Sequence, residues 1–117
     1  MADDERTLQQ AQKAVDDWIN QWEEGYWPPL SNLARLSEEV GELARLLNEL
    51  HGAKPPKDGL SASSDDVAEE LGDILFVTIG LANSLDVDLD DALRQVMEKY
   101  GVRDAHRFTP AEERDDH

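Results

Sequence analysis

Two segments of the chain place acidic residues three apart beside an apolar helical stripe, and this arrangement limits the possible folds most strongly. The first segment pairs Glu39 with Glu42, and the second pairs Glu70 with Asp73. Residues three apart lie on one side of a helix, with about 5–6 Å between their Cβ atoms. Charge is costly to bury without a partner, and no Lys or Arg stands between the two acids of either pair. If the two helices pack side by side, four carboxylates converge, and a bound divalent cation is the simplest physical reason for them.

The alternative is that these acids only hydrate an exposed helix face. The chain has 27 Asp and Glu against 11 Lys and Arg, so acids three apart also occur by chance. The near-repetition favours a site, because Glu-Glu-x-x-Glu is followed by Glu-Glu-x-x-Asp, with Gly41 and Gly72 directly before the last acids. A glycine inside a helix costs about 1 kcal/mol against alanine. Two glycines at matching positions therefore suggest that something approaches the backbone closely there.

The ligand chemistry of the two pairs favours a hard cation. The chain has no Cys, and neither helix core contains a His, whereas di-iron bundle sites use Glu-x-x-His pairs. Ligation by oxygen alone favours Mg²⁺ or Mn²⁺ over Zn²⁺ or iron. Mg²⁺ usually completes its shell with water and substrate phosphates. The acids therefore predict phosphoanhydride chemistry, since a polyanion needs cations to approach so acidic a protein.

Apolar periodicity predicts an all-α fold, a four-helix bundle. Helices are expected over about residues 4–24, 31–50, 65–85 and 89–100. Pro28 and Pro29 are expected outside the helices, and Gly101 at the end of the fourth. The third helix is apolar on two sides, with Phe76 and Ile79 opposite its main stripe, so it should be central and incompletely covered. We therefore expect a homo-oligomer, a dimer or a tetramer, with third-helix residues such as Phe76 or Ile79 in the subunit contact.

Length and charge exclude several classes of function. A chain of 117 residues fits one domain, expected over residues 1–108, followed by an acidic, disordered tail over 109–117. The net charge of −16 argues against binding nucleic acid or an anionic membrane. The start has no signal-peptide pattern, and the longest apolar run, residues 74–77, is far too short for a membrane span, so a cytoplasmic protein is expected. The Pro- and Ser-rich segment 53–64 is expected to be a loop, either a lid or a plain linker.

Two further features could contact a substrate. The corner around Trp27 is rich in aromatic residues and proline, and it either packs internally or forms a wall on which a base can stack. Lys99, Arg103 and Arg107 recur at steps of four in this acidic chain. They either hold phosphates or pair with surface acids, and the spacing leaves both interpretations open.

The paired acid motifs resemble the signature of the MazG-like nucleotide pyrophosphohydrolases, in the all-α NTP pyrophosphatase superfamily that also includes the dimeric dUTPases. The resemblance rests on Leu36-Ser37-Glu38-Glu39-Val40-Gly41-Glu42-Leu43 and Glu69-Glu70-Leu71-Gly72-Asp73-Ile74-Leu75-Phe76. Weaker matches at residues 24–27, 81–85 and 99–108 extend it over roughly residues 8–108.

This resemblance implies a Mg²⁺-dependent enzyme, with Mn²⁺ able to substitute, that hydrolyses (d)NTPs to (d)NMP and pyrophosphate in house-cleaning of the nucleotide pool. The implied metal ligands are Glu39, Glu42, Glu70 and Asp73. Glu38 would orient or deprotonate the attacking water. Lys99 and Arg103 would hold phosphates, while Trp27 and Asn83 would contact the nucleoside. The competing interpretation is a non-catalytic acidic helical bundle that binds a partner protein. That interpretation explains the charge but not the matched acid pairs, and neither defines a preferred base or sugar.

Overall fold

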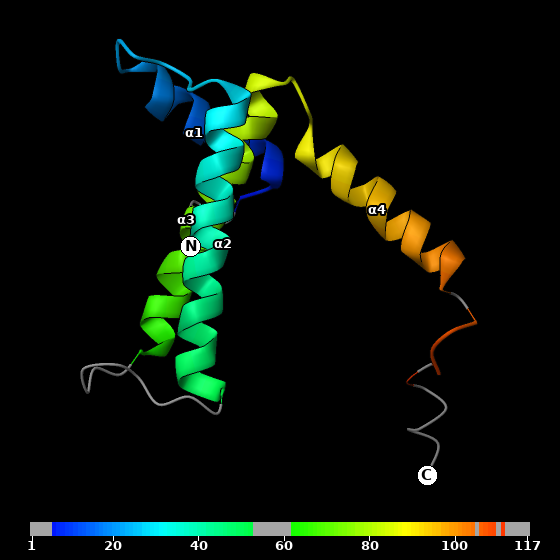
Figure 1. The fold of residues 1–117 in the computed structure, drawn as a ribbon. Coiled ribbons are helices and arrows are strands. Elements are labelled where there is room, and N and C mark those ends of the chain that lie inside the picture. Colours follow the sequence, from blue (N-terminus) through cyan, green and yellow to red (C-terminus); the bar gives the residue numbers. More distant parts are fainter. Residues whose placement is uncertain (1–5, 53–61, 105, 110, 112–117) are drawn as a thin grey trace.

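The computed structural model describes residues 6–52, 62–104, 106–109 and 111. Within these ranges all regular secondary structure is helical (Figure 1). The four helices are α1 (Leu8–Asn20), α2 (Pro29–His51), α3 (Ser64–Ser84) and α4 (Leu89–Arg103). The predicted all-α fold with four helices is confirmed. The predicted helical residues 4 and 5, most of the 53–64 loop and most of the 109–117 tail lie outside the described residues.

Local sequence explains where the helices begin. Thr7 caps α1 in a capping box with Gln10, so α1 begins later than its apolar periodicity predicts. Ser63 caps α3 in the same way with Asp66. The prediction that both prolines stand outside helices is wrong, because Pro29 is the first residue of α2. A proline is tolerated there, since the first N–H of a helix has no intrahelical partner.

The glycines differ in their roles. Gly25 adopts φ 63° and turns the chain between α1 and α2, in a conformation that glycine reaches without strain. The prediction that Gly101 ends the fourth helix is wrong, because α4 continues to Arg103. A side chain added at Gly41 or Gly72 would meet no described atom of the chain within 4 Å. The close approach expected at these two glycines therefore does not occur within the described part of one chain.

The core of the described chain lies between α3 and its neighbours. α2 and α3 form an antiparallel pair, and α1 lies across the end where α2 begins and α3 finishes (Figure 1). The buried hydrophobic residues are Leu46, Val77, Ile79 and Ala82. Ile79 is only 3% exposed within one chain, so its predicted place in a subunit contact is wrong. Phe76 is half-buried and packs edge-on against Trp18, with ring centroids 5.6 Å apart, so it too has a partner in its own chain.

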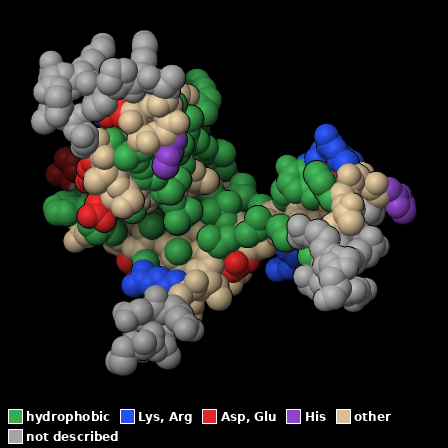
Figure 2. All heavy atoms as spheres, turned by 90° about the horizontal axis from the view of Figure 1, so that it is seen from below, with side chains coloured by type: hydrophobic (Ala, Val, Ile, Leu, Met, Phe, Trp, Pro, Cys, Tyr) green, Lys and Arg blue, Asp and Glu red, His purple; other side chains and the backbone are tan. Residues whose placement is uncertain are grey.

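The last helix forms an arm. α4 contacts α1 and projects away from the α2–α3 pair (Figure 1). None of its residues is buried. The exposed large hydrophobic side chains of α4 are Leu93, Met97, Tyr100 and Val102. Figure 2 shows hydrophobic side chains gathered on one face, over the main body and along the arm. Among the described residues, no helix combines the length and apolar character needed to cross a membrane.

Candidate active site

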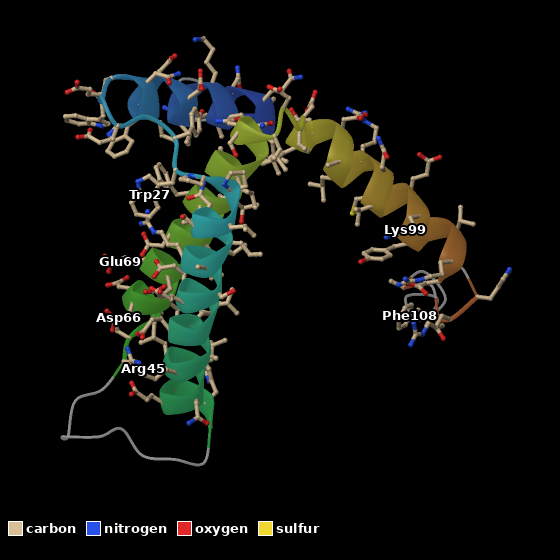
Figure 3. All side chains as sticks on the ribbon, turned by 45° about the horizontal axis from the view of Figure 1, so that its top comes forward. Trp27, Arg45, Asp66, Glu69, Lys99 and Phe108 are labelled. Carbon is tan, nitrogen blue, oxygen red and sulfur yellow. The ribbon has the colours of Figure 1, made fainter. Side chains whose placement is uncertain are left out.

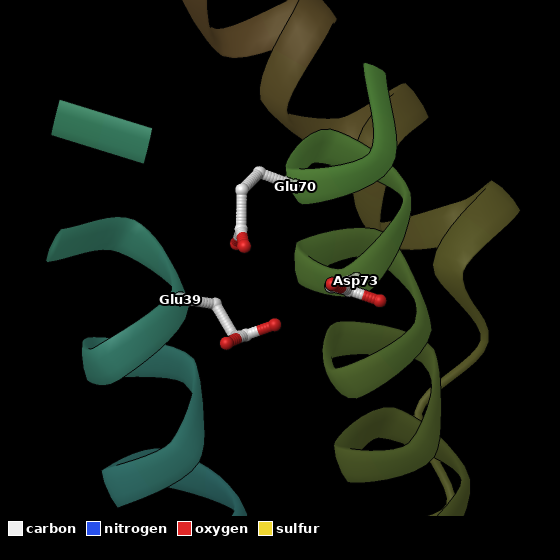
Figure 4. A group of neighbouring side chains, drawn as sticks. All are labelled: Glu39, Glu70 and Asp73. Carbon is white, nitrogen blue, oxygen red and sulfur yellow. The ribbon is translucent and has the colours of Figure 1, made fainter. Parts of the chain in front are cut away.

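Three carboxylates from two helices meet between α2 and α3. Glu39 projects from α2, and Glu70 and Asp73 project from α3 (Figure 4). One oxygen of each lies within 4.8 Å of the corresponding oxygens of the other two, and all three residues are half-buried. The spacing of three along α3 puts its two acids on one side, and the packing of the two helices adds the third. Three of the four acids that the sequence predicted to converge are therefore brought together.

Glu70 has the most constrained carboxylate of this cluster. Its Oε2 atom is buried and has no hydrogen-bond partner among the described residues. Burial raises the pKa of Glu70, and the negative charges of Asp73 and then Glu42 raise it further. Both causes disfavour the ionised form. An ionised carboxylate can only accept, so this oxygen needs either a proton or a cation.

Glu39 is perturbed in the same direction. Burial raises the pKa of Glu39, and the nearby carboxylates of Glu70 and Asp73 raise it further, whereas Arg35 lowers it. The cluster therefore holds its negative charge at a cost that a divalent cation would remove. Its donors are carboxylate oxygens only, which fits Mg²⁺ or Mn²⁺ better than Zn²⁺ or iron.

The fourth predicted ligand, Glu42, lies about one turn further along α2 and outside the group of three. Arg45 Nη2 lies 3.0 Å from Glu42 Oε2, and Arg45 Nη1 lies 2.9 Å from Glu49 Oε1. As expected, no Lys or Arg stands between Glu39 and Glu42 in the sequence. Arg45, three residues after Glu42, nevertheless forms an ion pair with it. Such exposed ion pairs are weak. Glu38, the predicted water-activating residue, is exposed next to Glu39.

An aromatic cavity of ≈ 350 Å³ lies toward the start of α2. The aromatic residues that line it are Trp18, Trp22, Tyr26, Trp27 and Phe76. Trp27 remains 52% exposed, and the guanidinium carbon of Arg35 lies 5.7 Å from its ring centroid. The corner around Trp27 thus packs against other side chains, and part of Trp27 itself also stays exposed beside the cavity. A largely apolar hollow with a few polar groups is typical of a small-molecule site.

Asn83 lies outside this cavity, in a network that joins three helices. Its Nδ2 donates to the carbonyl oxygen of Gln12 at 2.9 Å, and Gln12 Nε2 donates back to Asn83 Oδ1 at 2.9 Å. Gln12 Nε2 also donates to the Val87 carbonyl oxygen at 2.8 Å, and its Oε1 accepts from the Leu89 N–H at 2.9 Å. This network ties α1 to α3 and to the beginning of α4. The nucleoside contact of Asn83 stays a prediction.

The predicted phosphate-binding residues lie on the arm. Lys99 Nζ lies 5.2 Å and the Arg103 guanidinium carbon 4.7 Å from the Tyr100 ring centroid. Arg103 and Arg107 also pair with Asp104, at 3.2 Å and 3.5 Å. Figure 3 shows Lys99 on α4, well apart from Glu69 on α3. Within one chain, these cations therefore do not join the carboxylate cluster.

Comparison with known proteins places this arrangement in a family. Residues 28–108, which contain the carboxylate cluster, match the model of the MazG nucleotide pyrophosphohydrolase domain. The chain belongs to the MazG family. A Bacillus subtilis (strain 168) protein, YpjD, is 48% identical to this MazG chain over 111 residues, which cover 93% of this chain and 96% of YpjD.

Two crystal structures resemble this MazG chain in fold and sequence. The Bacillus-conserved MazG protein, a nucleotide pyrophosphohydrolase, matches with a TM-score of 0.71 and 44% identity, covering 83% of this chain and 92% of that one. The YpjD structure from Bacillus subtilis matches with a TM-score of 0.73 and 46% identity, covering 82% and 96%. The family resemblance seen in the acid motifs is confirmed. This MazG domain is a nucleotide pyrophosphohydrolase, a hydrolase that acts on phosphoanhydride bonds.

Two further polar residues of the MazG domain, Asn32 and Arg35, were not predicted from the sequence. Both line the aromatic cavity, and both precede Glu39 on α2. Their spacing of seven and four residues from Glu39 was the available signal, because residues four and seven apart share a helix face. The acid motifs identify only carboxylates, so they do not indicate the polar residues nearer the start of the helix.

Proposed function

We propose that this MazG domain uses Mg²⁺ to hydrolyse ribo- or deoxynucleoside triphosphates to the monophosphate and pyrophosphate. The observation that carries the proposal is the half-buried cluster of Glu39, Glu70 and Asp73, in which a buried Glu70 oxygen has no partner among the described residues. Mn²⁺ accepts the same oxygen ligands and should substitute. The membership of the family supports the reaction class, and the all-oxygen donor set supports the choice of metal.

The three clustered carboxylates hold the cation in this proposal, and Glu42 joins them by leaving its exposed pair with Arg45. When bound, Mg²⁺ neutralises phosphate charge and lowers the pKa of a coordinated water. Glu38 is exposed beside Glu39, where it can accept a proton from the attacking water. Attack at the α-phosphorus releases pyrophosphate.

The nucleoside occupies the aromatic cavity in this proposal. The half-exposed ring of Trp27 offers a face for stacking a base, and the volume of ≈ 350 Å³ falls within the range of small-molecule sites. The cavity and the carboxylate cluster share α2 as a wall. A nucleotide that spans both would place its base at the start of α2 and its phosphates further along the helix.

The active unit in this proposal is a homo-oligomer, in which the arm of one copy reaches the carboxylate cluster of another. Lys99 and Arg103 belong to α4, which projects away from the α2–α3 pair that carries the cluster (Figure 1), so a second copy must supply them if they bind phosphate. The exposed hydrophobic residues of α4 include Leu93 and Met97. Val40 on α2 is exposed too, as are other large hydrophobic side chains of α2 and α3. Removing such apolar faces from water is the dominant favourable term in most protein–protein association.

A nucleotide panel tests the reaction. Each of the eight common (d)NTPs is incubated with Mg²⁺, with Mn²⁺ or with chelator, and released pyrophosphate is measured. At least one nucleotide should yield pyrophosphate with either metal and none with chelator. Asp73→Asn should abolish release, whereas Asp17→Asn, on an exposed acid of α1, should not. Equal release with chelator would contradict the metal role.

Mixing two impaired variants tests the shared site. At a triphosphate concentration well below the KM of Arg103→Ala, that variant and Glu70→Gln should each release little pyrophosphate alone, and the two chains unfolded and refolded together should regain part of the wild-type activity. The mixed oligomer recovers activity because some of its sites combine an intact cluster with an intact arm. Sedimentation should show an oligomer at micromolar concentration. A folded monomer, or no recovery in the mixture, would contradict the shared site.

A further inference from the structure

One face of α2 carries a continuous line of polar side chains from the aromatic cavity to the carboxylate cluster. Asn32, Arg35 and Glu39 occupy successive turns of this helix. At about 100° per residue, all three lie within an arc of about 60°, and about 10 Å of helix rise separates the first from the last. The two residues nearer the start of the helix line the cavity, and the last belongs to the cluster. The line therefore connects the two halves of the site.

Arg35 stands at the boundary between these halves. Its guanidinium carbon lies 5.7 Å from the ring centroid of Trp27, in the cavity wall. It also lies four residues before Glu39 on α2, so it stands one helical turn from the cluster on the same side of the helix. Most other arginines of the described chain form ion pairs within 4 Å: Arg45, Arg94, Arg103 and Arg107. Among the described residues, half-buried Arg35 has no carboxylate at that distance, although the whole chain carries a net charge of −16.

Asn32 is the buried polar residue of the described chain, at 9% exposure. Its side chain lines the aromatic cavity and makes no hydrogen bond to another described residue. A carboxamide offers both a donor and an acceptor. The polar atoms of Asn32 are not among those enclosed without a partner, so this amide stays accessible at the cavity, where it can pair with a ligand that has donors and acceptors at its edge.

We propose that Asn32 and Arg35 form the nucleoside monophosphate half of the substrate site, with Asn32 on the base edge and Arg35 on the phosphate next to the sugar. The planar guanidinium can bind two phosphate oxygens at once. Because Arg35 lies between the cavity and the cluster, it holds the reacting phosphate at the cluster's edge while the outer phosphates extend beyond it. This inference rests on the proposed function, and it adds a positioning residue that fixes which phosphate meets the attacking water.

Tryptophan fluorescence tests the inference without turnover. The cavity is lined by Trp18, Trp22 and Trp27, so a bound base should quench emission. In chelator, the four common deoxynucleosides and their 5′-monophosphates are titrated into the intact protein. For the best nucleoside, the ratio of its Kd to that of its monophosphate measures the phosphate contact. Arg35→Gln should lower this ratio about ten-fold or more, and change the Kd of the nucleoside itself less than two-fold. Arg35→Lys should recover part of the ratio.

The controls separate the two residues and the overall charge. Arg94→Gln removes the same charge from an exposed position on α4 and should leave the ratio unchanged. Asn32→Leu should weaken nucleoside and monophosphate alike, with the ratio retained. An unchanged ratio in Arg35→Gln, or no quenching by any of the eight ligands with wild-type protein, would overturn the inference. Failure of the proposed function is distinguishable, because it appears as no pyrophosphate release from wild-type protein whatever the binding ratio.

Discussion

Replacing Glu70 with Gln should stabilise the metal-free protein, or leave it unchanged, while abolishing its response to metal. Burial raises the pKa of Glu70, and the charges of Asp73 and Glu42 raise it further, so its ionised form destabilises the empty fold at neutral pH. The amide has nearly the same shape and no charge. Its NH₂ group can donate to a neighbouring carboxylate of the cluster, whereas the buried oxygen of Glu70 has no partner among the described residues.

The expected change in folding stability follows from the free energy of metal binding. A ligand at 100 times its Kd stabilises the folded state by about 2.7 kcal/mol. For a domain of this size, that corresponds to a rise in Tm on the order of 10 °C. Wild-type protein should show this rise with saturating Mg²⁺. Glu70→Gln should show little of it, because one of the three clustered ligands is gone.

The assay is thermal unfolding followed by circular dichroism, with chelator and with Mg²⁺. Asp17→Asn is the matched control, because it removes one exposed charge from α1 and belongs to neither the cluster nor the cavity. It should behave as wild type in both conditions. A Glu70→Gln protein that is clearly less stable in chelator and still gains about 10 °C with Mg²⁺ would refute the reasoning, because Glu70 would then be a structural residue.

Three further outcomes are expected. Glu38→Gln should keep most of the metal-induced stabilisation while kcat falls by about 10²–10⁴, the usual range for losing a general base; loss of metal binding would make it a ligand instead. In chelator, the free energy of unfolding should rise as pH falls from 7 toward the ordinary carboxyl range, because the folded-state pKa values of Glu39 and Glu70 are raised and the folded protein binds their protons more readily. This stabilisation is complete below the unfolded-state pKa and is lost as pH rises through the folded-state pKa. The free energy of unfolding of the Glu39→Gln/Glu70→Gln double variant, measured in urea, should not show this rise. Trp27→Ala should raise KM or alter base preference more than it slows kcat, whereas Arg103→Ala should weaken binding of every triphosphate alike; a base-dependent effect of Arg103→Ala would reverse the two roles.

The helices and most of the cluster could be predicted because they depend on local periodicity. The spacing of three between Glu70 and Asp73 fixes their common side as soon as the segment is helical. Glu39 rather than Glu42 completes the cluster because the rotation of α2 against α3 decides which acid faces the partner helix. That rotation is a tertiary property, and so is the pairing of Glu42 with Arg45.

The course of the arm could not be predicted from periodicity. The connection after α3 passes through Asp86, whose φ of 57° turns the chain sharply. Asn83 and Gln12 then fix the start of α4 against α1 through their hydrogen bonds. These contacts are 71 residues apart in sequence, so no local pattern announces them. α4 therefore contacts α1 and projects away from the α2–α3 pair (Figure 1), and the arm is left with an uncovered apolar face.

The burial of Asn32 and the surroundings of Arg35 are also tertiary properties. Asn32 is exposed or buried according to how the corner around Trp27 folds over it, and a sequence pattern does not contain that information. Arg35 would pair with an acid on most helical surfaces, because acids outnumber basic residues in this chain. Its lack of an ion pair among the described residues becomes visible only in three dimensions.

The most direct test of the central claim is where water enters the substrate. Wild-type protein is incubated with a nucleoside triphosphate and Mg²⁺ in ¹⁸O-labelled water, and the products are examined by phosphorus NMR. Attack at the α-phosphorus, held between Arg35 and the carboxylate cluster, should give labelled nucleoside monophosphate and unlabelled pyrophosphate. Orthophosphate as the sole inorganic product, or the label in pyrophosphate, would contradict the account.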